Sequence, residues 1–239
     1  DSGTFQSYIY GDVEVGVEQI VEFQTSIGVD IATMLDVFSR PDMTYVQVEE
    51  CVDETLKRAE PSVNAARSTM LNGPIQGGLF KELRTKSAKG MADFDFAIHP
   101  IGGIVPVMEQ HRYKDYAKIM LATLPYLPPQ RPVHMFGCGH PMLFPMSIAL
   151  GADLFDSAAY ALFARDGRLL TPWGTERIES MNDWPMILPC VAYISPLEAK
   201  ALPKDERTKL LARYNLEMTL SELAPVSYTH LRAHETVHH

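Results

Sequence analysis

Short apolar runs alternate with segments of helical periodicity along most of this chain, and this alternation restricts its fold more than any other feature. A short apolar run bounded by turn residues is typical of a buried strand, whereas apolar positions that recur every three or four residues indicate a helix. Strands that alternate with helices predict βαβ units and therefore a parallel sheet. We expect strands at residues 31–35, before residue 76, and at 94–98, 133–136 and 154–155, and helices at 13–27, 46–71 with a break at Pro61, 79–88, 113–123, 142–150 and 158–164.

Each predicted strand ends in a polar or glycine-rich cluster. Because the carboxyl ends of parallel strands meet at one edge, we expect five of these residues to converge on one rim: Asp36, Gln76, Gly102, Gly137 and Asp156. Such a rim is the mouth of a (β/α)8 barrel, and we predict an α/β fold of this TIM-barrel type. A doubly wound open sheet is the competing architecture. A barrel would place about three further strands upstream of Asp1, so we expect a barrel truncated at its N-terminus.

Composition narrows the class of protein. A length of 239 residues suits one large α/β domain, and the first residue, Asp1 rather than Met, indicates an internal piece of something longer. Three widely spaced cysteines form neither a disulfide framework nor a metal pattern, and no signal peptide or spanning apolar run is present, so we expect a cytoplasmic protein with no membrane partner. The net charge of −9 argues against a broad polyanion-binding surface but allows a local basic strip.

Three aspartates are the candidate reactive groups. Asp156 follows the last predicted strand, where barrel enzymes place their chemistry, although an aspartate there could equally be the N-cap of the next helix. Asp1 and Asp36 also stand at expected rim positions. Carboxylates without a metal pattern suit acid–base and nucleophilic work at an acetal-like carbon, which favours glycosyl transfer. The alternative is that all three are helix caps.

The chain resembles the catalytic domain of tRNA-guanine transglycosylases, and within that family the archaeosine type. The resemblance lies in ordered blocks spread over residues 1–174, of which no single one is specific. The blocks are Asp1-Ser-Gly-Thr-Phe5-Gln6, Gly73-Pro-Ile-Gln76-Gly77-Gly78, His99-Pro-Ile-Gly102-Gly103, His134-Met-Phe136-Gly-Cys-Gly-His140-Pro141 and Gly151-Ala-Asp-Leu-Phe-Asp156-Ser-Ala-Ala-Tyr160.

The resemblance implies a (β/α)8 barrel and a base exchange, in which a guanine in the D-loop of tRNA is replaced by 7-cyano-7-deazaguanine. It implies that Asp156 is the nucleophile, which forms a covalent ribosyl-aspartate. For Asp1 it implies either the nucleophile or the general acid and base, and we favour the second role. It further implies a base site in which the carboxylate of Asp36 pairs with the donor edge of the purine. The other base contacts carried over are Gln76, Gly102 and Gly103, with Phe5 and Phe136 stacking on the two faces of the ring.

Two further regions match the family in part. Arg165 and Arg168 match arginines near the RNA backbone, with a solvated turn as the alternative. The family holds a zinc ion with three cysteines and a histidine, but here only Cys190 is retained and Tyr214 stands at the histidine position, so we expect no cofactor and no structural zinc.

These expectations define the organisation and the partners. We expect an incomplete catalytic barrel at residues 1–175, a degenerate zinc-region segment packed on it at 176–224, and a non-native tail at 225–239 that resembles translated adapter sequence. The expected partners are tRNA and a 7-deazaguanine-type base, with a homodimer left open. Since barrel strands would be missing, we expect the isolated chain to be poorly active. The alternatives are a non-catalytic partner subunit of a transglycosylase and a barrel glycosyl hydrolase acting on free nucleosides.

Overall fold

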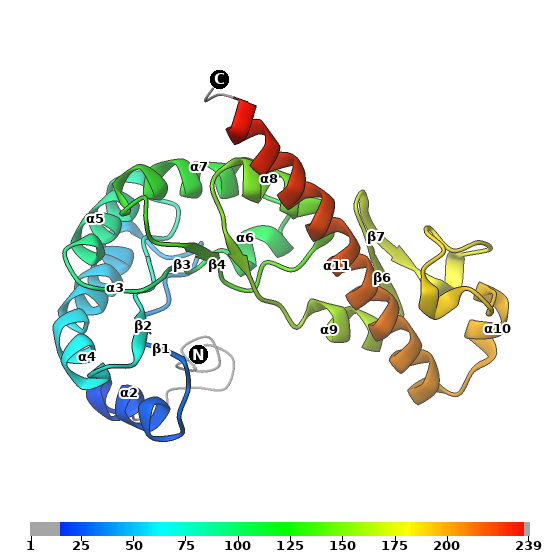
Figure 1. Cartoon of the computed structure of the whole chain (residues 1–239), viewed down its shortest axis with the longest axis horizontal. Coiled ribbons are helices and arrows are strands. Elements are labelled where there is room, and N and C mark those ends of the chain that lie inside the picture. Colours follow the sequence, from blue (N-terminus) through cyan, green and yellow to red (C-terminus); the bar gives the residue numbers. More distant parts are fainter. Residues whose placement is uncertain (1–14, 237–239) are drawn as a thin grey trace. The chain divides into compact units, whose positions relative to one another are not determined.

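The computed structural model describes residues 15–236, with the backbone alone for 225–236. Its contacts divide the chain into two compact units (Figure 1). Over the described residues, the first unit covers 15–136 together with 150–154, and the second covers 137–149 and 155–236.

Four short parallel strands form the centre of the first unit. β1 (Ile31–Thr33) pairs with β2 (Met70–Asn72), and β3 (His99–Ile101) pairs with β4 (Val133–Met135). Isolated parallel bridges connect the β2 and β3 segments. β3, β4 and β5 (Leu154–Phe155) form one three-stranded sheet, in that order. Strands alternate with helices, so the predicted α/β class with parallel strands is confirmed.

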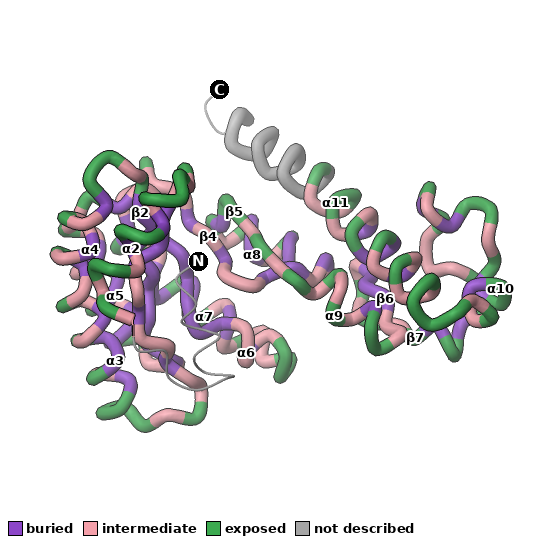
Figure 2. Tube along the Cα trace, turned by 90° about the horizontal axis from the view of Figure 1, so that it is seen from below, coloured by how far each residue is buried: buried purple, intermediate pink, exposed green. Residues whose placement is uncertain are grey.

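Helices cover one side of these strands. Figure 1 shows the longer helices of the first unit in an arc around β1 to β4, and Figure 2 shows buried residues along the strands and the inner faces of those helices. The helices of this unit are α2 (Val17–Ser26), α3 (Tyr45–Lys57), α4 (Ala59–Ala66), α5 (Lys81–Ala92), α6 (Val105–Glu109) and α7 (Tyr113–Thr123), with a 3-10 turn at Leu124–Tyr126.

Some predicted boundaries in this unit are wrong. The helix expected to reach residue 71 ends at Ala66, because Met70–Asn72 pair with β1 as strand β2. The long helix breaks at Arg58 rather than at Pro61, since Pro61 lies in the first turn of α4, where a missing N–H breaks no helical hydrogen bond. The third strand begins at His99, after the apolar run that was expected to form it. In that run the N–H of Phe96 donates to the carbonyl of Phe94 at 2.9 Å, so a tight turn uses a group that a strand would need.

The second unit packs around one long helix. α11 (Lys204–Thr236) lies against α9 (Ala159–Arg165) and against a hairpin that the sequence did not predict, β6 (Arg168–Thr171) and β7 (Gly174–Arg177). The buried amide of Asn215 joins these elements: it accepts from the N–H of Leu170 and donates to two carbonyls of the neighbouring segments. The other elements are α8 (Phe144–Ala149), α10 (Pro196–Ala201) and 3-10 turns at Pro141–Leu143, Ile178–Ser180 and Pro189–Val191.

None of the helices over the described residues combines the length and the apolar character that crossing a membrane would require.

Candidate active site

Three predicted site residues gather where β1, β2 and β3 end. Asp36 follows β1 and Gln76 follows β2, and both are buried, with 7% and 1% exposure. Nε2 of Gln76 donates to Oδ2 of Asp36 at 2.5 Å. Gly102 follows β3, and its N–H donates to the carbonyl of Ile75 at 3.0 Å. Residues far apart in the sequence therefore meet at one edge, as parallel strands require.

The two glycines after β3 leave no room for side chains. A Cβ on Gly102 would lie 2.3 Å from Nε2 of Gln76, and a Cβ on Gly103 would lie 2.8 Å from the carbonyl oxygen of Ser39. Gly103 also has a φ of +71°, which other residues rarely adopt. The loop after β3 therefore approaches Gln76 with its main chain alone.

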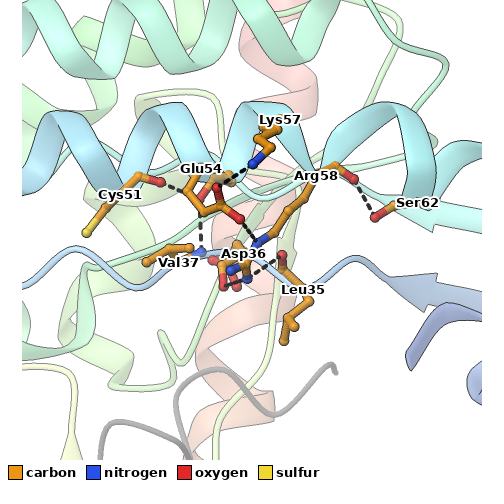
Figure 3. A network of polar contacts seen from close by, with 9 residues as sticks. Leu35, Asp36, Val37, Cys51, Glu54, Lys57, Arg58 and Ser62 are labelled. Atoms are coloured by element: carbon orange, nitrogen blue, oxygen red, sulfur yellow. Dashed lines mark hydrogen bonds and ion pairs between the residues drawn. The ribbon is translucent and has the colours of Figure 1, made fainter. Parts of the chain in front are cut away.

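Helix α3 and its C-cap residue Arg58 hold the main chain on both sides of Asp36 (Figure 3). The N–H of Val37 donates to Oγ1 of Thr55 at 2.9 Å. Nη1 of Arg58 donates to the carbonyls of Leu35 and Asp36 at 3.4 and 3.5 Å. Because these contacts engage main-chain groups, they fix the loop while the carboxylate of Asp36 meets Gln76.

Sequence reasoning missed two buried residues of this group. The main-chain N–H and the hydroxyl of Ser39 both donate to Oε1 of Gln76, at 3.2 and 2.8 Å. The guanidinium of Arg84, on α5, donates to three main-chain carbonyls around the site. Arg84 stands in the run Lys-Glu-Leu-Arg-Thr-Lys-Ser, which looks like a solvated helix face, so no signal in the sequence separates it from the exposed cations beside it.

Asp156 belongs to the second unit and follows β5. Oδ1 of Asp156 accepts from the N–H of Gly137 at 3.0 Å. The expectation of a buried strand before it is wrong, because Leu154 is 40% exposed. The helix-cap alternative is also wrong, because α9 has Ala158 at its N-cap, and it is Oγ of Ser157 that accepts the N–H of Ala159.

A hollow of about 180 Å³ opens beside Asp156 within the second unit. The segment after β4 forms part of it and packs closely on the Asp156 segment, since a Cβ on Gly139 would lie 2.0 Å from that of Ser157. Apolar residues of α11 form another wall. The lining residues are Cys138, Gly139, Phe144, Phe155, Asp156, Ser157, Tyr160, Leu216, Thr219, Leu220 and Leu223.

The remaining predicted residues have separate surroundings. Phe136, at the end of β4, meets the ring of His134 edge to face with centroids 4.9 Å apart. Arg165 is exposed near the end of α9. Arg168 lies 3.9 Å from the ring centroid of Phe163 and pairs with Asp166 at 2.8 Å. Asp1 and Phe5 lie outside the described residues.

The segment that matches the zinc region is an apolar cluster. Tyr214 is fully buried, stacks on Trp184 with ring centroids 5.5 Å apart, and accepts the N–H of Met186 at 3.2 Å. Burial raises the pKa of Tyr214 to about 12, and burial together with Glu217 raises the pKa of the Cys190 thiol to about 12. Over the residues with described placement, no three His, Cys, Asp or Glu side chains gather to hold a metal ion.

Comparison with known proteins places these residues in a family. The chain is 48% identical over 230 residues to a tRNA-guanine(15) transglycosylase of Methanocaldococcus jannaschii, a match that covers 93% of this chain and 35% of the relative. A protein of the same description from Thermococcus kodakarensis is 45% identical over 223 residues, covering 93% of this chain and 38% of the relative. The chain thus spans little more than a third of the length of these relatives.

The family model described as Queuine tRNA-ribosyltransferase matches residues 1–226. This match covers most of the chain and includes every block on which the predicted resemblance rests. The chain therefore belongs to the queuine tRNA-ribosyltransferase family.

Proposed function

We propose that this chain is part of the catalytic domain of a tRNA-guanine transglycosylase that exchanges a guanine in the D-loop of tRNA for 7-cyano-7-deazaguanine. The observation that carries the proposal is the buried Asp36–Gln76 pair at the strand ends. A carboxylate has about four lone-pair sites, so Asp36 can accept from Gln76 and also from the N–H and amino groups of guanine. Adenine offers no such edge, and a buried carboxylate left unpaired would disfavour it. The archaeal relatives described as tRNA-guanine(15) transglycosylases support the same reaction.

The proposed chemistry is a double displacement at the ribose. A carboxylate oxygen of Asp156 attacks C1′ as the bond from C1′ to the guanine nitrogen breaks, and Asp1 protonates the leaving base. Asp1 then takes the proton from the incoming base, whose nitrogen attacks C1′ and releases Asp156. Dividing the exchange into two displacements predicts ping-pong kinetics. The N–H of Gly137 supports this role because it holds the Asp156 carboxylate in one orientation.

The target base would flip out of the RNA stack and bind between the rings of Phe5 and Phe136. Gly102 and Gly103 would lie at the edge of this base site. Arg165 and Arg168 are proposed RNA contacts. For Arg168 a phosphate would compete with Asp166, so we assign the stronger contact to Arg165. The proposed macromolecular partner is tRNA. A homodimer with a second copy of this chain stays an untested prediction.

The architecture that suits this chemistry is a (β/α)8 barrel, supported by the parallel strands and their helices. We propose that the chain consists of a catalytic barrel at residues 1–175, a zinc-region segment at 176–224 and a non-native tail at 225–239. We further propose that the 176–224 segment holds no zinc. Two features support this: Cys190 is the one cysteine of the family's zinc motif that the sequence retains, and the buried Tyr214 stands at the histidine position, so a tetrahedral zinc site lacks its ligands. A cytoplasmic location follows from the tRNA substrate.

Base exchange tests the proposal directly. The full-length protein is incubated with tRNA and labelled guanine, and incorporation of label is measured. We expect Asp156→Ala to lower the exchange rate by ~10³-fold or more, because no covalent intermediate can form. Asp183→Ala, which changes an exposed aspartate of the same unit, should stay within about twofold of the parent. A parent protein that shows no exchange would favour the non-catalytic partner subunit.

A further inference from the structure

Arg84 is a fully buried cation whose hydrogen bonds go to main-chain carbonyls. Its Nε donates to the carbonyl of Gly78 at 2.9 Å, and its Nη1 donates to those of Ile75 and Gly102 at 3.0 and 2.9 Å. Ile75 and Gly78 lie on either side of Gln76, and Gly102 belongs to the loop after β3. One side chain therefore links the two loops that form the base site.

Ser39 determines which way the amide of Gln76 faces. A main-chain N–H can only donate, so the Gln76 atom that faces the N–H of Ser39 must be the oxygen. The hydroxyl of Ser39 accepts the N–H groups of Gly77 and Gly78 at 3.1 and 3.0 Å, which directs its own proton to Oε1 of Gln76. The amino group of Gln76 is consequently turned to Asp36.

We infer that Ser39 and Arg84 are positioning residues of the base site: Ser39 holds the amide of Gln76 in one orientation, and Arg84 holds the Gln76 loop against the Gly102 loop. The inference rests on the proposed function of this site and deepens it, since it says how the recognition of guanine is set before the base arrives. Preorganised polar groups discriminate better than groups that must be ordered by the ligand.

A purely structural role accounts less well for Arg84. Burying a cation away from a carboxylate is unfavourable, and an apolar side chain of similar size would often be as stable or more stable. Burial lowers the pKa of Arg84 to about 9, so the side chain is still charged at neutral pH. Lysine would keep the charge but lose the planar arrangement of donors that reaches three carbonyls at once. Geometry rather than charge is therefore the property that the site uses.

Steady-state exchange with the full-length protein tests the inference through the KM for guanine. We expect Ser39→Ala, Arg84→Lys and Arg84→Met each to raise this KM by about tenfold or more, with kcat at saturating base within about threefold of the parent. Lys81→Met removes an exposed cation from the same helix and should leave both constants unchanged. If Arg84→Lys keeps the parental KM, or if Ser39→Ala lowers kcat alone, the positioning role is overturned.

A second measurement does not depend on activity. The side-chain amide protons of Gln76, assigned with a Gln76→Glu variant, are followed by NMR for their exchange with solvent. In the parent they should be protected by Asp36, and Ser39→Ala should speed their exchange by about tenfold or more, since it removes one of the two donors to Oε1 of Gln76 and the acceptor of the N–H groups of Gly77 and Gly78. Unchanged protection would refute the inference. A parent that lacks base exchange but loses protection in Ser39→Ala would refute the proposed function and leave the positioning role supported.

Discussion

At the residue scale, Gly102 has the least room for a side chain among the glycines of the base site. The nearest atom to a Cβ there is Nε2 of Gln76, the atom that donates to Asp36. We predict that Gly102→Ala pushes this amide away from the carboxylate. The KM for guanine should rise by about tenfold or more, and the free energy of unfolding should fall by about 1–3 kcal/mol from overpacking. Exchange kinetics and chemical denaturation measure the two effects.

Gly16→Ala provides the control for this change. A Cβ on Gly16 would meet the nearest atom, in Gln19, at 3.5 Å, which is an ordinary contact. The expected change is below about 1 kcal/mol in stability, with no change in KM. Equal KM values for Gly102→Ala and the parent would show that the base does not sit against this loop.

At the element scale, the loop after β1 depends on α3. Oγ1 of Thr55 donates to the carbonyl of Cys51 at 2.7 Å and accepts the N–H of Val37 at 2.9 Å. Thr123 on α7 is equally buried, but its Oγ1 donates to the carbonyl of Ile119 at 2.8 Å, a residue of its own helix. The two threonines therefore differ in the contact that reaches the Asp36 loop.

We predict that Thr55→Val lowers the free energy of unfolding by about 1–2 kcal/mol more than Thr123→Val, because it leaves the N–H of Val37 without its acceptor. Urea denaturation of both variants measures the difference. Hydrogen exchange at Val37 should accelerate in Thr55→Val alone. Identical denaturation curves for the two variants would show that α3 does not hold this loop.

At the scale of the whole molecule, stability should depend on alkaline pH through the cluster around Tyr214. The unfolded phenol ionises near pH 10, whereas burial raises the pKa of Tyr214 in the folded protein to about 12. Between these values the unfolded chain loses a proton that the folded chain keeps, so stability falls as pH rises. The expected loss from Tyr214 is about 2–3 kcal/mol between pH 10 and 12. The raised pKa of Cys190 acts in the same direction from pH 9 upward.

Replacing the phenol isolates its contribution. Tyr214→Phe should lose about 1 kcal/mol at neutral pH, since the N–H of Met186 loses its acceptor, and should then fall less steeply above pH 10 than the parent. Tyr193→Phe changes a fully exposed tyrosine and should follow the parental curve. Denaturation midpoints measured from pH 7 to 12 decide the matter. A slope for Tyr214→Phe equal to the parental slope would mean that Tyr214 is not buried in solution.

Several elements could be predicted from the sequence because local pattern determines them. α7 has its predicted limits, and β1 and β4 lie within the predicted runs. β3 was displaced because the N–H of Phe96 is used in a local turn, which apolar content does not reveal. The β6–β7 hairpin was missed because its pairing and its contact with Asn215 connect distant parts of the chain.

The sequence by itself determined the family, the parallel α/β class and the positions of Asp36, Gln76 and Gly102 at strand ends, because motif order and apolar periodicity are properties of the chain alone. Only the tertiary structure decided that Ser39 orients Gln76 and that Arg84 is buried between two loops. An arginine on a helix has the same local sequence whether it faces water or the interior. Its role therefore depends on which loops fold over it, and that depends on strand pairings between residues far apart in the chain.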